Sequence, residues 1–297
     1  MDDSEGTLAA QRVAIIGLGL MGGSLALALQ GRVAALLAVD TDPEVRSLAA
    51  QQRIVERITA DTEGIIHQAD VIILASPVGT ILKHIQLLGE QASSARQSGS
   101  PLEPGSIILL DLGSTKQAVV EAMQSLPQAF DPIGGHPICG KETSGLKHAE
   151  ASLYVGATFA FTLLERTSTR ARNLANSLAA AVGATPVWID AASHDRWVAF
   201  TSHLPYLLAN SLAGIIPGDA VTFVGPGYRS TSRLASASPA VMLDILLTNR
   251  ERVLEALHSY QKQVALIEEA LAEGDFTWLT SLLEAGAHRH HSSINKT

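Results

Sequence analysis

The sequence holds a single cysteine, Cys139, in 297 residues. An internal disulfide is therefore excluded, which fits a reducing compartment. Aromatic residues make up only 4% of the chain, while 46% of it is hydrophobic. The core must then be built from aliphatic side chains and alanine, and a chain of this length is expected to form two domains.

Basic charge and long apolar runs are also scarce. The chain has 21 Lys and Arg against 29 Asp and Glu, for a formal net charge of −8. That balance argues against nucleic acid or an anionic membrane surface as the main partner. Glycines and charges interrupt every apolar run before it reaches bilayer-spanning length. The acidic start, Met1–Glu5, lacks the basic region of a signal peptide, so we predict a cytoplasmic protein.

Metal-binding patterns are likewise missing. No Cys/His spacing matches a zinc site, and we predict no bound metal. Four residues near the end, His288–His291, include three histidines. We interpret them as part of a solvated tail rather than a metal site.

What the chain does contain is a glycine motif between a strand-like and a helix-like segment. The apolar run Val13–Ile16 ends in Gly17-x-Gly19-x-x-Gly22, and a second apolar run ends at Asp40. In this pattern the glycines allow a tight turn, close approach of a pyrophosphate, and close helix–strand packing. The helix N-terminus offers N–H groups to phosphates. A carboxylate at Asp40 accepts hydrogen bonds from ribose hydroxyls and repels an added phosphate, which predicts NAD rather than NADP.

The first part of the chain alternates strand-like and helix-like patterns. Continuous apolar runs, typical of strands buried on both faces, occur at Val13–Ile16, Leu36–Asp40, Val71–Ser76 and Ile107–Asp111. Helical patterns include Pro43–Arg53 and Val78–Glu90, and the Ser- and Gly-rich segment Gln91–Gly105 is predicted to be a surface loop. The alternation predicts an α/β fold with a Rossmann-type, doubly wound, mostly parallel sheet. Ligands then bind beyond the carboxyl ends of the strands.

The later part of the chain turns helical. Ala157–Leu164 and Thr185–Ile189 are predicted strands, with a helix over Arg170–Val182 between them. From Ala191 onward we expect only helices, over Ala191–Ile216 with a kink near Pro205, Pro239–Glu273 and Phe276–Ala285. These patterns predict a dinucleotide-binding domain over residues 1–190 and a helical substrate and dimerisation domain over residues 191–297. Such apolar helices are expected to pack against a second copy of the chain, and we expect no appended regulatory domain.

Two polar clusters follow predicted strands. Ser114 lies in Asp111–Lys116, where it is expected either to cap a helix or to contact substrate or nicotinamide. His136 lies in the glycine- and proline-rich segment Ile133–Gly145, which we interpret as an irregular loop. An imidazole titrates near neutrality and can accept a proton, although a structural histidine is the alternative.

Other polar residues of the same regions are less specific signals. Lys141 and Glu142 are expected to pair with one another or with the second domain, and Cys139 is interpreted as a packed residue rather than a nucleophile. In the helical part, His203 and Tyr206 are three residues apart and would share a helix face. Together with His194 they are candidates to line a cleft.

A glycine-rich turn in the helical part precedes two arginines. Arg229 and Arg233 follow Gly225-Pro-Gly227. A guanidinium group binds carboxylates in a bidentate manner. This makes the pair a candidate for holding an anionic substrate.

Together these motifs resemble the prephenate/arogenate dehydrogenase family. The resemblance covers nearly the whole chain, and Gly-Gly-His-Pro and Ser-His-Leu-Pro are its family-specific elements, whereas the nucleotide motif is general. The motifs that occur in the family's order and spacing are Gly17–Gly22, Ser76–Val78, Asp111–Lys116, Gly134–Gly140 with Ser144 and Gly145, Ser202–Pro205 and Gly227–Arg233.

The resemblance implies a Rossmann domain followed by a helical dimerisation domain, a homodimer, and NAD-dependent oxidative decarboxylation of a cyclohexadienol in tyrosine biosynthesis. It implies His136 as the catalytic base, with Ser114 as its partner, and Arg233 as the anchor of a substrate carboxylate. Further expected substrate contacts are His203, Tyr206, Glu142 and Lys141. The expected cofactor contacts are Gly17, Gly19, Leu20, Met21, Gly22, Asp40, Ser76 and Pro77.

The chain departs from the pattern at two positions. Tyr206 stands where many members of the family have His, and Lys141 stands where some have Thr. These departures leave the choice between prephenate and arogenate, and feedback inhibition by tyrosine, open. We predict prephenate, with arogenate as the alternative. A different two-domain dehydrogenase or imino-acid reductase is a further alternative, but it would need its own catalytic Lys or Ser pattern in the helical domain, which we do not find. A non-enzymatic NAD-sensing protein would keep Gly17–Gly22 but would not need His136 and Arg233.

Overall fold

The structure is a computed structural model that describes residues 7–294, with the last two of these as backbone only. The acidic start on which the signal-peptide prediction rested, Met1–Glu5, lies outside the described residues. The chain separates into two compact units, one ending at Arg250 and the other beginning at Glu251.

The first unit is built on an eight-stranded sheet in the order β3-β2-β1-β4-β5-β6-β7-β8. The first six strands are parallel, β7 is antiparallel to β6, and β8 is parallel to β7. The predicted doubly wound, mostly parallel sheet is therefore confirmed. Its strands are β1 (Arg12–Ile16), β2 (Ala35–Val39), β3 (Arg57–Thr59), β4 (Val71–Leu74), β5 (Ile107–Asp111), β6 (Phe130–Pro137), β7 (Thr158–Leu163) and β8 (Thr185–Trp188).

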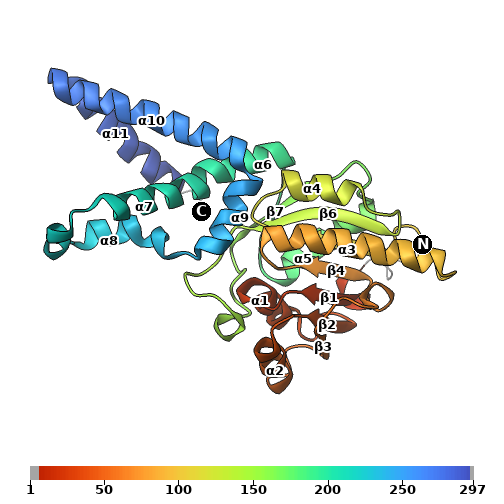
Figure 1. Ribbon diagram of the computed structural model, residues 1–297. Helices are drawn as coiled ribbons and strands as arrows, with labels where there is room; N and C mark the ends of the chain where they lie inside the picture. The colour runs from red at the N-terminus through yellow and green to blue at the C-terminus, as the bar shows by residue number, and fades with distance from the viewer. Residues whose placement is uncertain (1–6, 295–297) are drawn as a thin grey trace. The chain divides into compact units, whose positions relative to one another are not determined.

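Helices cover both faces of this sheet (Figure 1). Val13 and Ile15 of β1 pack on one face against α1 (Leu20–Leu29), α2 (Pro43–Gln51) and α5 (Thr169–Ala181). Ala14 and Ile16 pack on the other face, against α3 (Val78–Gln97) and α4 (Gln117–Gln124). Successive side chains of a strand alternate between faces. Both faces are apolar here, which is why the strands read as continuous hydrophobic runs.

The structure differs from the sequence-based prediction in two places in the part of the chain that forms the sheet and its helices. Helix α3 continues to Gln97, so the prediction of a loop from Gln91 is wrong for its first half. Ala92 and Ala95 are buried there and extend the helix's apolar stripe. The segment around His136 is strand β6 rather than an irregular loop. Its pairing with β7 keeps Gly134 and Gly135 extended despite their low strand propensity.

The helical part of the first unit holds α6 (Ala191–Val198), α7 (Leu204–Ile215), α8 (Pro226–Ser232) and α9 (Pro239–Thr248). A π-helical turn, Ala199–His203, joins α6 to α7, which begins at Leu204, so the regular helix is interrupted near Pro205, where a kink was predicted. The predicted helix Pro239–Glu273 is interrupted at Asn249, which follows α9.

The second unit consists of α10 (Arg250–Glu273, counted from its second residue) and α11 (Phe276–Ile294), joined at Gly274 in a left-handed conformation. Its exposed large apolar side chains are Leu254, Tyr260, Val264, Leu266, Leu271, Phe276 and Leu283. The segment His288–His291 is helical and exposed, and the described residues contain no cluster of three metal-ligating side chains. Nor does the described part of the chain contain a helix long and apolar enough to cross a membrane.

Candidate active site

The glycine motif forms a tight turn between β1 and α1. Gly17 has φ +96°, and a Cβ on Gly22 would lie 1.9 Å from the carbonyl oxygen of Gly17. A Cβ on Gly19 would meet nothing within 4 Å, and no side chain caps the helix that starts after it. The open N-terminus of α1 therefore fits the pyrophosphate of a dinucleotide. Leu20 and Met21 form its first turn.

Asp40 lies directly after β2, beside this turn. One carboxylate oxygen accepts from the backbone N–H of Leu18 at 2.7 Å, and the other accepts from that of Asp42 at 2.9 Å. The guanidinium of Arg46 donates to the carbonyl oxygens of Asp40 and Thr41 at 2.9 and 2.8 Å. The carboxylate thus fixes the glycine turn, and the Arg46 guanidinium is held against the backbone that follows β2.

Two serines lie at the carboxyl ends of neighbouring strands. The buried hydroxyl of Ser76, just before Pro77 and α3, has no hydrogen-bond partner among the described residues. Ser114 is half-buried, and it does not cap α4: that helix begins at Gln117, and Asp195 accepts from its first N–H groups. The capping interpretation of Ser114 is therefore wrong, and both hydroxyls are left for a ligand.

His136 lies near the end of β6 and is half-buried. Its Nδ1 is 2.9 Å from Nε2 of His194. Burial, the neighbouring His194 and the cation of Lys116, with a smaller effect of His203, hold the pKa of His136 well below its usual value. The imidazole is consequently neutral at physiological pH and able to accept a proton.

A fully buried ion pair lies near His136. The ammonium group of Lys116 pairs with Asp111, and both side chains are fully buried. Asp111 also accepts from the backbone N–H groups of Gly113 at 2.7 Å and Gly135 at 3.1 Å. Burial lowers the pKa of Lys116, while Asp111 and Asp195 oppose that shift. Buried charges persist only when paired in this way.

The glycines before His136 allow β6 to approach this ion pair. A Cβ on Gly135 would lie 2.7 Å from the carbonyl oxygen of Asp111 and 2.9 Å from the side chain of Leu110. A Cβ on Gly134 would lie 3.4 Å from the side chain of Lys116. The Gly-Gly-His-Pro motif thus has a steric cause that its composition did not reveal.

A second buried cluster joins α6 to the residue that follows α9. Asp195 accepts from Nδ1 of His194 at 2.8 Å, and the amide of Asn249 donates to the carbonyl oxygen of Asp195 at 2.7 Å. The same amide nitrogen lies 3.2 Å from Nδ1 of His203. Burial lowers the pKa of His203 to about 4. His203 is therefore a buried, neutral member of this second cluster.

The candidate anchor for an anionic substrate is exposed. Arg233 forms an ion pair with Glu142, and Lys141 pairs with Glu150 at 2.7 Å. Lys141 and Glu142 thus do not pair with one another, whereas the expected pairing of Glu142 with the helical region is present. Tyr206 is buried in α7.

Cys139 is half-buried, and burial raises the pKa of its thiol to about 11. A thiol with a raised pKa is a poor nucleophile, as its interpretation as a packed residue requires.

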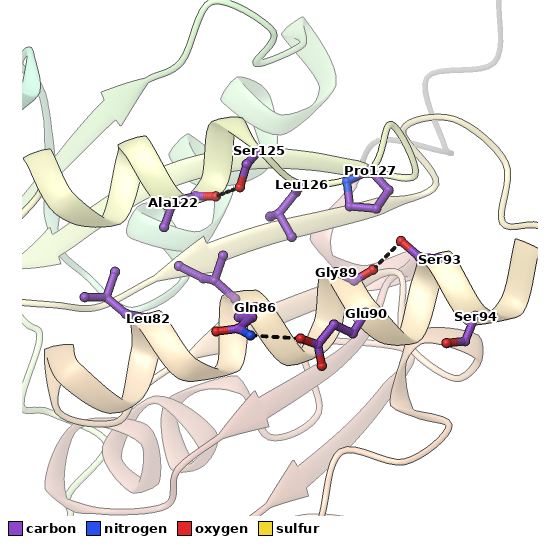
Figure 2. Close-up of a pocket in the computed structure, with 11 residues that line it drawn as sticks. Leu82, Gln86, Gly89, Glu90, Ser93, Ser94, Ala122, Ser125, Leu126 and Pro127 are labelled. Carbon is purple, nitrogen blue, oxygen red and sulfur yellow. Dashed lines mark hydrogen bonds between the residues drawn. The ribbon is translucent and has the colours of Figure 1, made fainter.

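A groove of about 640 Å³ lies elsewhere in the first unit. It runs between α3 and α4, and Leu82, Gln86, Glu90 and Leu126 are among its lining residues (Figure 2). Glu90 is its only ionisable side chain among the lining residues, and it accepts a hydrogen bond from Gln86 at 2.8 Å. Because this groove is formed by the later part of α3 and the end of α4, it lies away from the carboxyl ends of the strands. The groove is therefore not the candidate active site.

Comparison with known families decides between the dehydrogenases that this architecture accommodates. The family model described as "prephenate dehydrogenase, nucleotide-binding domain" matches residues 24–187, and "prephenate dehydrogenase, dimerization domain" matches residues 190–285. The chain belongs to the prephenate dehydrogenase family. It is thus an oxidoreductase, and the alternatives of another two-domain dehydrogenase and of a non-enzymatic NAD sensor fall away.

Individual members of the prephenate dehydrogenase family align over most of the chain. Prephenate dehydrogenase of Bacillus subtilis is 28% identical over 273 residues, which is 89% of this chain and 71% of that protein. The structure is similar to that of Aquifex aeolicus prephenate dehydrogenase in complex with hydroxyphenyl propionate and NAD+, with a TM-score of 0.85, 25% identity and coverage of 96% and 99% of the two chains. Synechocystis arogenate dehydrogenase gives a TM-score of 0.76 at 27% identity, with 92% and 96% covered.

Several members of the site had no role predicted for them from the sequence. These are Asp111, Lys116, Asp195 and Asn249, whereas His194 was a candidate to line a cleft without a predicted contact to His136. Asp111 and Lys116 had a usable signal, since two opposite charges flank a strand end. The contact of His194 with His136 had none, because it joins segments 58 residues apart.

Proposed function

We propose that the protein catalyses the NAD-dependent oxidative decarboxylation of prephenate to 4-hydroxyphenylpyruvate. The observation that carries the proposal is the neutral imidazole of His136, half-buried near the carboxyl end of β6. The strand order reverses between β1 and β4, and β6 lies on the same side of that point as β4 and β5. Ser76 and Ser114 follow the carboxyl ends of β4 and β5. Such a group is suited to hold or remove the proton of the ring hydroxyl.

NAD fits the residues at the carboxyl ends of the strands where the nucleotide is expected to bind. Gly19 leaves the N-terminus of α1 open, Asp40 supplies a carboxylate at the ribose end, and the hydroxyl of Ser76 has no protein partner among the described residues. The Aquifex aeolicus relative was solved with NAD+. When bound, NAD accepts the hydride from the ring carbon that carries the hydroxyl.

The chain's own residues then have separate tasks. His136 takes the hydroxyl proton, and Ser114, whose hydroxyl has no partner among the described residues, holds the hydroxyl oxygen in place. Arg233 binds a substrate carboxylate in exchange for Glu142. Oxidation of the hydroxyl-bearing carbon gives a ketone, which draws electrons from the ring as its carboxylate departs as carbon dioxide, and the ring becomes aromatic.

Arogenate is the alternative substrate, and Tyr206 is the observation that keeps it open. Arogenate carries an ammonium group where prephenate carries a ketone. A phenol both donates and accepts hydrogen bonds, so Tyr206 tolerates either side chain, whereas a protonated histidine would repel the ammonium group. The Synechocystis relative is named an arogenate dehydrogenase.

We place the functional division of the chain at residues 190 and 191. The matches to the two family domains, residues 24–187 and 190–285, support this boundary. The match to a dimerization domain, together with the exposed Phe223, Leu243 and Leu247 of the helical part, supports a homodimer formed through residues 191–297. A cytoplasmic location stays a prediction.

The direct test is the absorbance of reduced nicotinamide when purified protein and NAD are mixed with prephenate or with arogenate. We expect reduction with both and a higher kcat/KM with prephenate. His136→Asn should lower kcat by about a hundred- to ten-thousand-fold, the usual contribution of a general base, with NAD binding unchanged. No reduction with either substrate would refute the proposal, and a tenfold preference for arogenate would overturn the choice of prephenate. Tyr206→His should then shift the ratio toward prephenate.

A further inference from the structure

The contacts of His136 continue beyond its first neighbour. Nδ1 of His136 lies 2.9 Å from Nε2 of His194, whose Nδ1 lies 2.8 Å from Asp195. The carboxylate of Asp195 also accepts from the backbone N–H groups of Lys116 at 2.7 Å and Gln117 at 2.9 Å. A carboxylate that meets only donors is ionised, so the row of contacts ends in a fixed negative charge.

That charge determines the tautomers of both imidazoles. His194 donates its Nδ1 proton to Asp195, so in the neutral ring its Nε2 is a bare acceptor. His136 must therefore donate from Nδ1 to that acceptor. This leaves Nε2 of His136 as the bare nitrogen, and no described residue bonds it.

The buried charges beside the two imidazoles do not cancel. Asp111, Lys116 and Asp195 are fully buried, and two negative charges stand against one positive charge. Because uncompensated buried charge is unfavourable, the cluster is stabilised by gaining one proton. The groups that face His136 are His194 from α6, Lys116 from the segment before α4, and His203 from the π-helical turn. Of these, His194 is the one whose side chain is hydrogen-bonded to the carboxylate of Asp195.

We propose that His136 passes the substrate proton on, and that the proton comes to rest on His194 against Asp195. This inference rests on the proposed function and adds two positioning residues to it, His194 and Asp195. The transfer also explains how His136 can act as a base although its imidazole alone binds a proton weakly.

The step balances as two linked transfers. The O–H bond of the substrate hydroxyl breaks as N–H forms at Nε2 of His136. The N–H bond at Nδ1 of His136 breaks as N–H forms at Nε2 of His194. His136 ends neutral in its other tautomer, and His194 ends as an imidazolium ion paired with Asp195. The reverse transfers return the proton to solvent after product leaves.

Two variants of His194 distinguish this proton relay from a purely structural role of His194. In His194→Gln an amide oxygen can lie where Nε2 was and accept from His136, but it cannot take the proton. In His194→Asn an amide nitrogen can lie where Nδ1 was, facing Asp195, and His136 loses its acceptor. We expect kcat to fall about 10- to 100-fold in the Asn variant, the usual effect of removing a group that orients a histidine. The Gln variant should lie between it and wild type, and the KM values of both variants should change less than about twofold.

A matched control is His84→Gln, which replaces a half-buried histidine of α3 away from the cluster and should leave kcat unchanged. Equal losses in the Gln and Asn variants, proportional to their losses of thermal stability, would overturn the relay. Wild-type kcat in the Gln variant would also overturn it, because the proton would then have no need to reach His194.

Nitrogen NMR of the ¹⁵N-histidine-labelled full chain gives a readout independent of activity. We expect His136 to be protonated at Nδ1 and bare at Nε2, with signals assigned from the His136→Asn and His194→Asn variants. A His136 protonated at Nε2 in the free enzyme would refute the relay. If instead His136→Asn kept its activity, the proposed function itself would fail, so the two failures are distinguishable.

Discussion

The free energy of unfolding is expected to fall as the pH is lowered, and His203 provides a measurable part of that fall. The pKa of His203 is about 4, against 6.5 for an ordinary histidine. Burial is the main cause and His194 adds to it, while Asp195 opposes it. The hydrogen bond gives a further reason, since the Asn249 amide nitrogen can only donate, so Nδ1 of His203 must stay unprotonated to accept.

The direction follows from which state binds the proton first. Because the folded pKa lies below the unfolded value, the unfolded chain is protonated first as the pH falls. Stability is therefore complete above the unfolded pKa of 6.5 and is lost as the pH falls from there toward the folded value of about 4. Between about pH 7.5 and about pH 5, this one group should cost about 2 kcal/mol.

Urea unfolding at fixed protein concentration measures this loss, with His203→Asn as the matched variant. The asparagine keeps an acceptor for Asn249 but does not titrate. His136 has a lowered pKa as well, but it is present in both proteins, and since His203 is the smallest of the causes of that shift, most of its effect cancels in the difference. Wild type should lose about 2 kcal/mol more than the variant over this range. Parallel stability curves for the two proteins would show that His203 is not held neutral by the fold.

Three further outcomes are expected. Arg233→Ala should raise the KM for substrate on the order of tenfold, the typical effect of losing a charge-assisted contact, and an unchanged KM in a folded variant would exclude the anchoring role. Asp40→Ser should raise kcat/KM for NADP relative to NAD, because it removes a carboxylate and Arg46 already contacts the backbone of that residue; an unchanged ratio would mean that Asp40 serves only to fix the glycine turn. Light scattering at micromolar concentration should give twice the chain mass of 31.3 kDa, and a monomer mass would contradict the dimer.

The sheet was predictable because its strands carry a strong local signal. Runs such as Val71–Leu74 are buried on both faces and are therefore continuously apolar. Strand β6 escaped prediction because Pro132, Gly134 and Gly135 have low strand propensity, and it is held extended by pairing on both sides. Tertiary pairing there outweighs the local preference.

The candidate site was predictable only in part, for a related reason. His136 and the glycine motif stand out in the sequence because glycines cluster around them. His194 was a candidate to line a cleft, but nothing local in its amphipathic helix links it or Asp195 to His136. Their role follows from the contact of α6 with α4 and β6, which no helical or strand periodicity encodes.

The π-helical turn Ala199–His203 has a consequence for the register of its helix. His194 and His203 are nine positions apart, which in a continuous α-helix would put them about 180° apart, on opposite faces. A π turn holds one extra residue, and it reduces that angle to about 80°. Both histidines can then reach the same buried cluster. In a relative that lacks the turn, the same pair would be expected eight positions apart. A one-residue gap aligned within Ala199–His203 therefore preserves the geometry, whereas the same gap in α6 after Asp195 would rotate His194 and Asp195 together relative to His203.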